Sequence, residues 1–184
     1  MTSSCVFERK RDAENFLAQL GPRLREFSLT LAEEKSGLVK FNRWEPDSSG
    51  KFTFLGFDFY WARTRRNRNH KMVKRRTSRK KLRAALGGMK DWIRTNMHKP
   101  LDWIVERLRA KLMGHWNYYG VLGNSQRLGT YEREVKGLIF KWLNRRSQRK
   151  SFTWEKLLAR WTTVWQLPPA RVVEEIDPAY QPRL

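Results

Sequence analysis

The chain has 184 residues, enough for one domain or two small ones, and its 40% hydrophobic and 13% aromatic content is sufficient for a packed core. Its formal net charge of +21 predicts a polyanionic partner and argues against a purely structural protein. The one cysteine excludes an intramolecular disulfide, and the absence of a signal peptide and of a transmembrane-length apolar window favours a cytoplasmic protein with no membrane partner.

The N-terminal third of the chain predicts a helix followed by two strands. Asp12 is a plausible N-cap for apolar residues that recur at helical spacing, and Pro22 within them predicts a kink or a break. "GLVKFNRW" alternates with a period of two, "EPDSSG" predicts a turn, and "KFTFLGFDFYW" predicts a second strand. We therefore expect an antiparallel hairpin, with Gly56 marking a bulge or a close approach of another backbone.

The remainder of the chain predicts four amphipathic helices, with "GHWNYYGVLGNS" as a glycine-bracketed aromatic turn between the second and the third. Pro168-Pro169 is expected to stop the fourth helix. Ser78 or Thr77 is a candidate cap of the first helix, and Ser125 is a candidate cap of the third. Pro100 suits the first turn of the second helix, and the fourth is expected to start near Thr153. The apolar stripes expected to pack together are Leu82, Ala85, Leu86, Met89, Trp92 and Ile93; Leu101, Ile104, Val105, Leu108 and Leu112; Leu128, Tyr131, Val135, Leu138, Ile139 and Trp142; and Leu157, Leu158, Trp161, Val164 and Trp165.

These elements predict an α+β fold in two parts. A small antiparallel β-hairpin plus a helix occupies residues 1–61, and an all-α domain occupies residues 77–167. Residues 62–76 form a basic connector between them, and residues 168–184 are expected to be an irregular tail.

The strongest functional signal is the basic stretch "WARTRRNRNHKMVKRRTSRKKLR", residues 61–83. From Arg63 to Arg83 it contains twelve Lys or Arg residues and no Asp or Glu, whereas a solvated loop or a disordered linker normally mixes charge signs. Lys and Arg neutralise phosphates, and Arg adds bidentate contacts and stacking, so nucleic-acid contact is favoured. The candidate nucleic-acid-binding residues are Arg63, Arg65, Arg66, Arg68, Lys71, Lys74, Arg75, Arg76, Arg79, Lys80, Lys81 and Arg83.

Two shorter motifs add candidates. In "GHWNYYG" Trp116 is expected in the core, whereas Tyr118 is the candidate for an exposed face on which a base stacks. "NRRSQRK", residues 144–150, places Arg145 and Arg146 at the end of the third helix. These cations either complement the helix C-terminus or form a second phosphate-contact patch, and the sequence supports both interpretations equally.

The sequence contains no recognisable group of catalytic or metal-ligating residues. His70, His98 and His115 are scattered and no cysteine pairs accompany them, so neither a zinc site nor another metal or cofactor is expected. There is no P-loop and no G-x-S-x-G motif. We interpret Asp12 as a helix cap and Asp58 as an outward-facing strand residue, which leaves no carboxylate cluster for two-metal chemistry.

The order of several motifs along the chain is specific. A helix followed by L-x-x-E-K-S precedes "FLGF", then come "TSRKKLRAAL", "GHWNYYG" and "WLNRR". From about residue 5 to about residue 167 this order resembles the C-terminal part of a bacterial group II intron reverse transcriptase/maturase. The resemblance implies that residues 5–61 are the end of the palm and that residues 77 to about 150 are the maturase-specific thumb, domain X. It also implies binding of intron RNA, assistance to splicing, and a grip on a template–primer duplex.

The chain departs from this family at the catalytic residues. Family polymerases carry a Tyr-Ala-Asp-Asp box where this chain begins "MTSSCVFE", and the fingers, most of the palm and the HNH-type endonuclease domain have no counterpart. We therefore expect a non-enzymatic fragment that binds structured group II intron RNA. DNA at an insertion site and an N-terminal reverse transcriptase fragment are further candidate partners. The alternatives are one half of a split reverse transcriptase, active only with a separate fingers–palm chain, and a degenerate remnant without function.

Overall fold

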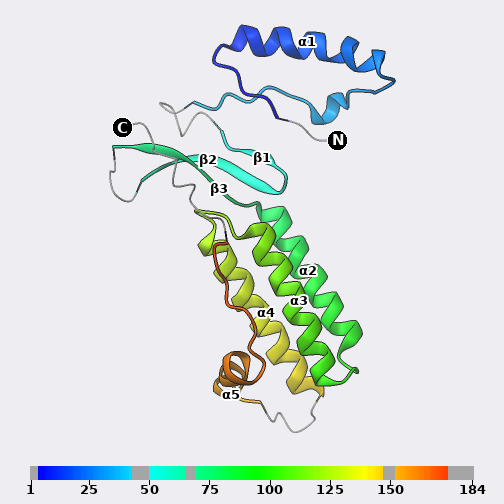
Figure 1. Ribbon diagram of the computed structural model, residues 1–184, viewed down its shortest axis with the longest axis vertical. Helices are drawn as coiled ribbons and strands as arrows, with labels where there is room; N and C mark the ends of the chain where they lie inside the picture. Colours follow the sequence, from blue (N-terminus) through cyan, green and yellow to red (C-terminus); the bar gives the residue numbers. More distant parts are fainter. Residues whose placement is uncertain (1–3, 43–49, 65–68, 147–151, 174–184) are drawn as a thin grey trace. The chain divides into compact units, whose positions relative to one another are not determined.

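The computed structural model describes residues 4–42, 50–64, 69–146 and 152–173 (Figure 1). It confirms the predicted α+β fold, with a three-stranded antiparallel sheet and a helical C-terminal part. The chain divides into two compact units, residues 1–55 with 59–73 and residues 56–58 with 74–184. The elements are α1 (Lys10–Glu26), η1 (Glu33–Lys35), β1 (Phe52–Phe54), β2 (Phe57–Arg63), β3 (Lys71–Thr77), α2 (Arg79–Asn96), α3 (Leu101–Tyr119), α4 (Ser125–Arg146), α5 (Trp154–Ala159) and the π-helix η2 (Arg160–Val164).

The sheet is antiparallel as expected, but only one of the two segments predicted as strands takes part in it. "GLVKFNRW" is not a strand over residues 37–42, and its last two residues lie outside the described part of the chain. The hairpin lies instead within "FTFLGFDFYW", where Leu55 (φ 48°) and Gly56 (φ 87°) make a two-residue turn with the positive angles of type I′. The third strand, β3, comes from the basic stretch, because pairing with β2 satisfies its backbone groups although its sequence has no apolar alternation.

The first unit holds α1 and an aromatic cluster. Asp12 is not the N-cap of α1 but lies in its first turn, after Arg9 at the cap position, where its carboxylate still complements the helix dipole. Pro22 lies within the helix and does not end it. The cluster stacks Phe52 on Phe59, with ring centroids 5.0 Å apart, and Phe41 contacts both Phe52 and Trp61.

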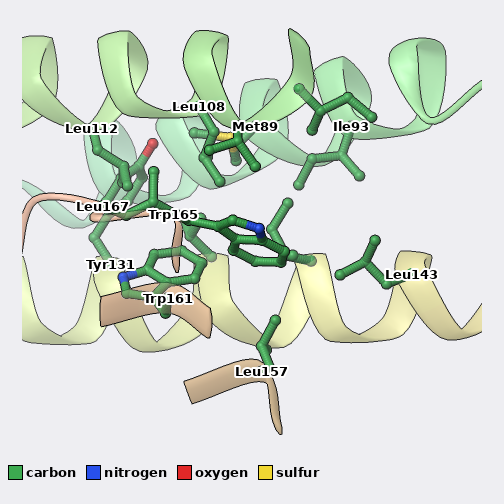
Figure 2. Packing of buried hydrophobic residues seen from close by; sticks show 14 of the residues in the cluster. Met89, Ile93, Leu108, Leu112, Tyr131, Leu143, Leu157, Trp161, Trp165 and Leu167 are labelled. Atoms are coloured by element: carbon green, nitrogen blue, oxygen red, sulfur yellow. The ribbon is translucent and has the colours of Figure 1, made fainter. Parts of the chain in front are cut away.

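The second unit is built around α2, α3 and α4, which run side by side, with the shorter α5 beside the lower part of α4 (Figure 1). Their buried apolar residues form one cluster, part of which is drawn in Figure 2. The predicted cap Ser78 is confirmed, and the fourth helix starts after Thr153 as expected. Each of these hydroxyls accepts a hydrogen bond from a backbone N–H three residues later. Ser125 is the first residue of α4 and not its cap, and Pro100 lies at the cap position of α3 and not in its first turn. The buried members of the cluster are Leu82, Met89, Ile93, Met97, Ile104, Val105, Leu108, Leu112, Trp116, Leu128, Tyr131, Val135, Ile139, Leu143, Leu157, Trp161, Trp165 and Leu167.

Two further expectations for this unit are wrong. Residues 114–119 are not a turn but the last part of α3, and the turn is confined to the five residues before Ser125. Leu158 and Val164 are exposed, although the helical stripe placed them in the core. The wider turn of η2 explains Val164, because a π-helix rotates less per residue than an α-helix and moves that side chain off the stripe.

The segment that follows η2 has no regular structure but is bonded to the helices. Trp116 is fully buried, as expected, and its indole Nε1 donates a hydrogen bond of 3.0 Å to the carbonyl of Pro168. The backbone N–H of Ala170 donates to the Glu132 carboxylate, and that of Val173 donates to the Gly120 carbonyl. Residues 165–173 are therefore part of the helical unit.

A buried amide joins three elements of this unit at one end. Asn124 has no exposed surface, and its Oδ1 accepts a hydrogen bond of 2.8 Å from the backbone N–H of Thr77. Its Nδ2 donates to Thr77 Oγ1 at 2.7 Å and to the carbonyl of Tyr119 at 2.8 Å. The end of β3, the end of α3 and the start of α4 are thus held by one side chain.

Replacing Asn124 with Ala should lower the free energy of unfolding by about 3 kcal/mol, because a buried N–H and a buried carbonyl lose their partners. Chemical denaturation followed by circular dichroism measures the change. The control is Asn117→Ala, at an exposed position of α3, which should change the stability by less than about 0.5 kcal/mol. Equal effects of the two substitutions would contradict this role for Asn124.

Candidate nucleic-acid interface

The first turn of α2 carries Arg79, Lys80 and Lys81, and all three are exposed. No acidic residue lies in that turn. The N-terminus of a helix carries a partial positive charge, so three further cations there are electrostatically unfavourable. A bound polyanion removes this cost, which makes the turn a good candidate for phosphate contact.

The basic residues singled out in the sequence fall into separate groups. Arg63 and Lys71 belong to the first unit, whereas residues 74–83 belong to the helical unit. In the helical unit Lys74, Arg75 and Arg76 are half-buried, and the basic residues of α2 are exposed. Arg65, Arg66 and Arg68 lie outside the described residues.

Asp58 is not the outward-facing residue that the sequence suggested. Only 6% of its surface is exposed, and its Oδ2 lies 3.9 Å from Nε of Arg76 on the neighbouring strand. A hydrogen bond from the Ser78 N–H to the Gly56 carbonyl fixes the antiparallel register in which residues 58 and 76 are opposite each other. A buried carboxylate needs a compensating cation, so Arg76 has a structural role and is less available to an external ligand.

The structure brings Tyr118 to the same end of the helical unit as the first turn of α2. The Tyr118 ring stacks on Phe57, with centroids 6.0 Å apart, and Phe57 also contacts Tyr119. A Cβ built on Gly56 lies 3.3 Å from Cγ of Lys81 and 3.4 Å from the Tyr119 hydroxyl oxygen, so these groups approach the hairpin turn closely. Tyr118 is 54% exposed, which leaves part of its ring open for stacking on a base.

Arg145 and Arg146 lie at the opposite end of the helical unit. The bonds of Asn124 place the starts of α2 and α4 together, and the 22 residues of α4 carry its C-terminus about 30 Å away. There Arg146 donates a hydrogen bond of 2.8 Å to the carbonyl of Lys99, and the Arg145 guanidinium lies 5.2 Å from the Trp142 ring centroid. These two arginines therefore do not belong to the basic patch at the start of α2.

Two basic residues of α3 lie over aromatic rings and were not among the candidates from the sequence. The Arg107 guanidinium lies 5.7 Å from the centroid of the Trp103 ring, and the Lys111 ammonium lies 5.1 Å from the Trp92 ring of α2. Both cations are exposed. The available signal was the four-residue spacing in W-x-x-x-R-x-x-x-K, which places all three side chains on one face of a helix.

His115 is buried between aromatic rings. It stacks on Tyr131, with centroids 3.7 Å apart and an interplanar angle of 6°. Burial lowers the pKa of His115 to about 4 and raises the pKa of Tyr131 to about 12, so neither group exchanges a proton near neutral pH. In the part of the chain that the structure describes, no cluster of three His, Cys, Asp or Glu residues is placed to hold a metal ion. Across that same part, no helix is long and apolar enough to span a membrane.

Part of the helical unit matches a known family. Residues 80–161 match the model of the group II intron maturase-specific domain, which confirms the resemblance over α2, α3, α4 and α5. This domain is the maturase-specific part of such proteins and is not a catalytic one. No curated protein and no solved structure is significantly similar to the chain.

The burial of His115 makes stability depend on pH. Its folded pKa of about 4 is below the unfolded value of about 6.5, so the unfolded chain takes up the proton first. The contribution of neutral His115 to the free energy of unfolding is fully present above pH 6.5. The free energy of unfolding should fall by about 3 kcal/mol as the pH drops from 6.5 through 4. Denaturation at several pH values measures this slope. His115→Gln should flatten it, and an unchanged slope in that variant would assign the effect to other groups.

Proposed function

We propose that this chain, whose residues 80–161 form a group II intron maturase-specific domain, binds structured group II intron RNA, assists its splicing and has no polymerase activity of its own. The observation that carries the proposal is the exposed cationic first turn of α2, which lies where the matched domain begins. RNA phosphates supply the charge that this turn lacks.

Each segment of the chain has its own role in this proposal. Residues 1–61 are the end of a reverse transcriptase palm, residues 62–76 a basic connector, residues 77–167 the thumb, and residues 168–184 a tail. The basic connector then supplies additional phosphate contacts from Arg63 and Lys71. DNA at an insertion site is a second candidate nucleic acid, because phosphate contacts do not distinguish the two.

A second candidate function is suggested by α1. No residue of this helix is buried, and Phe16 is 39% and the following Phe27 63% exposed. An exposed apolar face of this kind fits a role as the C-terminal half of a split reverse transcriptase, with a separate fingers–palm chain covering it. Polymerase activity on mixing the two chains supports this role, and its absence contradicts it.

The first test compares two RNAs. The purified chain is titrated with a folded group II intron RNA and with an unrelated structured RNA of the same length, across a series of salt concentrations. We expect tighter binding to the intron RNA that persists at moderate salt, because shape recognition adds to the electrostatic attraction. Equal binding to both RNAs, lost together as salt rises, would leave only non-specific attraction and would indicate a degenerate remnant.

The second test reverses the charge at the start of α2. Arg79→Glu with Lys80→Glu should weaken binding to the intron RNA about tenfold or more, because two cations are lost and two anions gained. The same changes should leave the stability equal or raise it by roughly 0.3–1 kcal/mol per residue, since acidic residues suit a helix N-terminus.

The matched control for this variant is Arg133→Glu with Lys141→Glu on α4, two exposed positions at which the net charge changes equally. We expect RNA binding close to that of the unaltered chain. Equal losses in the two double variants would mean that total charge determines affinity, and that the start of α2 is not the site.

A further inference from the structure

One face of α3 carries basic and aromatic side chains along most of its length. Residues four, eight, eleven and fifteen positions after Trp103 share its side of the helix. They are Arg107, Lys111, Gly114 and Tyr118, all exposed, and none of them is acidic. This face therefore extends from Trp103 to Tyr118, at the end of α3 where Tyr119 approaches Lys81 of α2.

The neighbouring part of α2 has a similar composition. Lys81, Gly88 and Trp92 are seven and four residues apart and share one side of that helix. Lys81 lies beside Tyr119 at the hairpin turn, and Trp92 contacts Lys111, so α2 and α3 run antiparallel along this face. Figure 1 shows the two helices side by side over this length.

Two of the three cations on this face lie over aromatic rings. The Trp92 and Trp103 rings are half-buried, and Lys111 and Arg107 lie over them at cation–π distance. A cation fixed on a ring loses less side-chain entropy when it binds a phosphate than a freely rotating one. The same contacts cover the tryptophan rings, so bases have access to Tyr118 but less to either tryptophan.

Two glycines on this face leave room for a backbone. A Cβ built on Gly88 or Gly114 meets nothing within 4 Å, so no packing constraint of the protein requires glycine there. Gly129 and Gly137 of α4 are equally open, so glycine alone does not identify the site. What distinguishes the α2–α3 face is the combination of open positions with the fixed cations and Tyr118.

We propose that this surface, made by Lys81, Gly88 and Trp92 of α2 and by Trp103, Arg107, Lys111, Gly114 and Tyr118 of α3, is a second contact site for the bound RNA. We call it the α2–α3 track. Lys81, Arg107 and Lys111 contact backbone phosphates, the two glycines allow the sugar–phosphate chain to approach, and Tyr118 stacks on a base. The proposal rests on the proposed function, since the same RNA continues from the start of α2.

The first test uses substitutions that should stabilise the helix but obstruct RNA binding to the α2–α3 track. Gly88→Gln and Gly114→Gln replace a helix-destabilising residue in open space, so each variant should denature at higher denaturant concentration than the unaltered chain. Each should bind intron RNA about tenfold more weakly, because the new side chain blocks the approach of the backbone. Gly129→Gln on α4 is the control, with the same gain in stability and unchanged RNA affinity.

The second test removes charge. Arg107→Gln with Lys111→Gln should lower the slope of log affinity against log salt concentration by about 1.5, or roughly 0.7–0.9 for each lost phosphate contact. Arg133→Gln with Lys141→Gln is the control and should leave the slope unchanged.

The two proposals fail in distinguishable ways. If the glycine and Arg107/Lys111 variants bind as the unaltered chain does while the Arg79/Lys80 variant loses binding, the track is wrong and the RNA-binding function stands. If none of these variants loses affinity, both proposals are overturned. A stable Gly114→Gln variant with reduced affinity, beside an unaffected Gly129→Gln variant, supports the track.

Discussion

The Asn124 side chain is the contact on which the arrangement of the helical unit depends. Its side-chain amide forms hydrogen bonds with the last residue of β3 and with the final carbonyl of α3. The backbone carbonyl of Asn124 accepts hydrogen bonds from the first turn of α4. Because Thr77 is fixed in this way, Ser78 caps α2 at a defined position. The cations of the next turn therefore project from a rigid element, which gives them a defined spacing that a flexible loop does not.

The net charge of the chain overstates how many cations are available to bind a polyanion. Arg76 balances the buried carboxylate of Asp58, Arg146 donates to the carbonyl of Lys99, and Arg109 donates to the carbonyl of Trp165. These guanidinium groups take part in internal contacts of the fold, although the sequence does not distinguish them from their neighbours. The first turn of α2 is different, since its cations are exposed and oppose the helix dipole.

Sequence periodicity predicted what depends on local structure. The cap at Ser78, the start of α5 near Thr153 and the stripes of α2, α3 and α4 follow from residues within one or two turns of each other. The strand β3 and the burial of Asp58 depend on pairing between separate segments, which the sequence of each segment does not encode alone. Likewise, the exposure of Tyr118 was predicted, but its stacking on Phe57 requires the fold of the whole unit.

Rigidity links the fold to the proposed assistance in splicing. A protein shifts an RNA folding equilibrium only if it binds the folded RNA more tightly than the unfolded RNA. Mobile cations on a disordered tail adapt to either form and give little difference. Cations fixed by a helix cap and by the Trp92 and Trp103 rings fit phosphates already held at a matching spacing, as they are in folded RNA. The unfolded RNA must first lose conformational entropy to meet the same array, so the rigid surface favours the folded form.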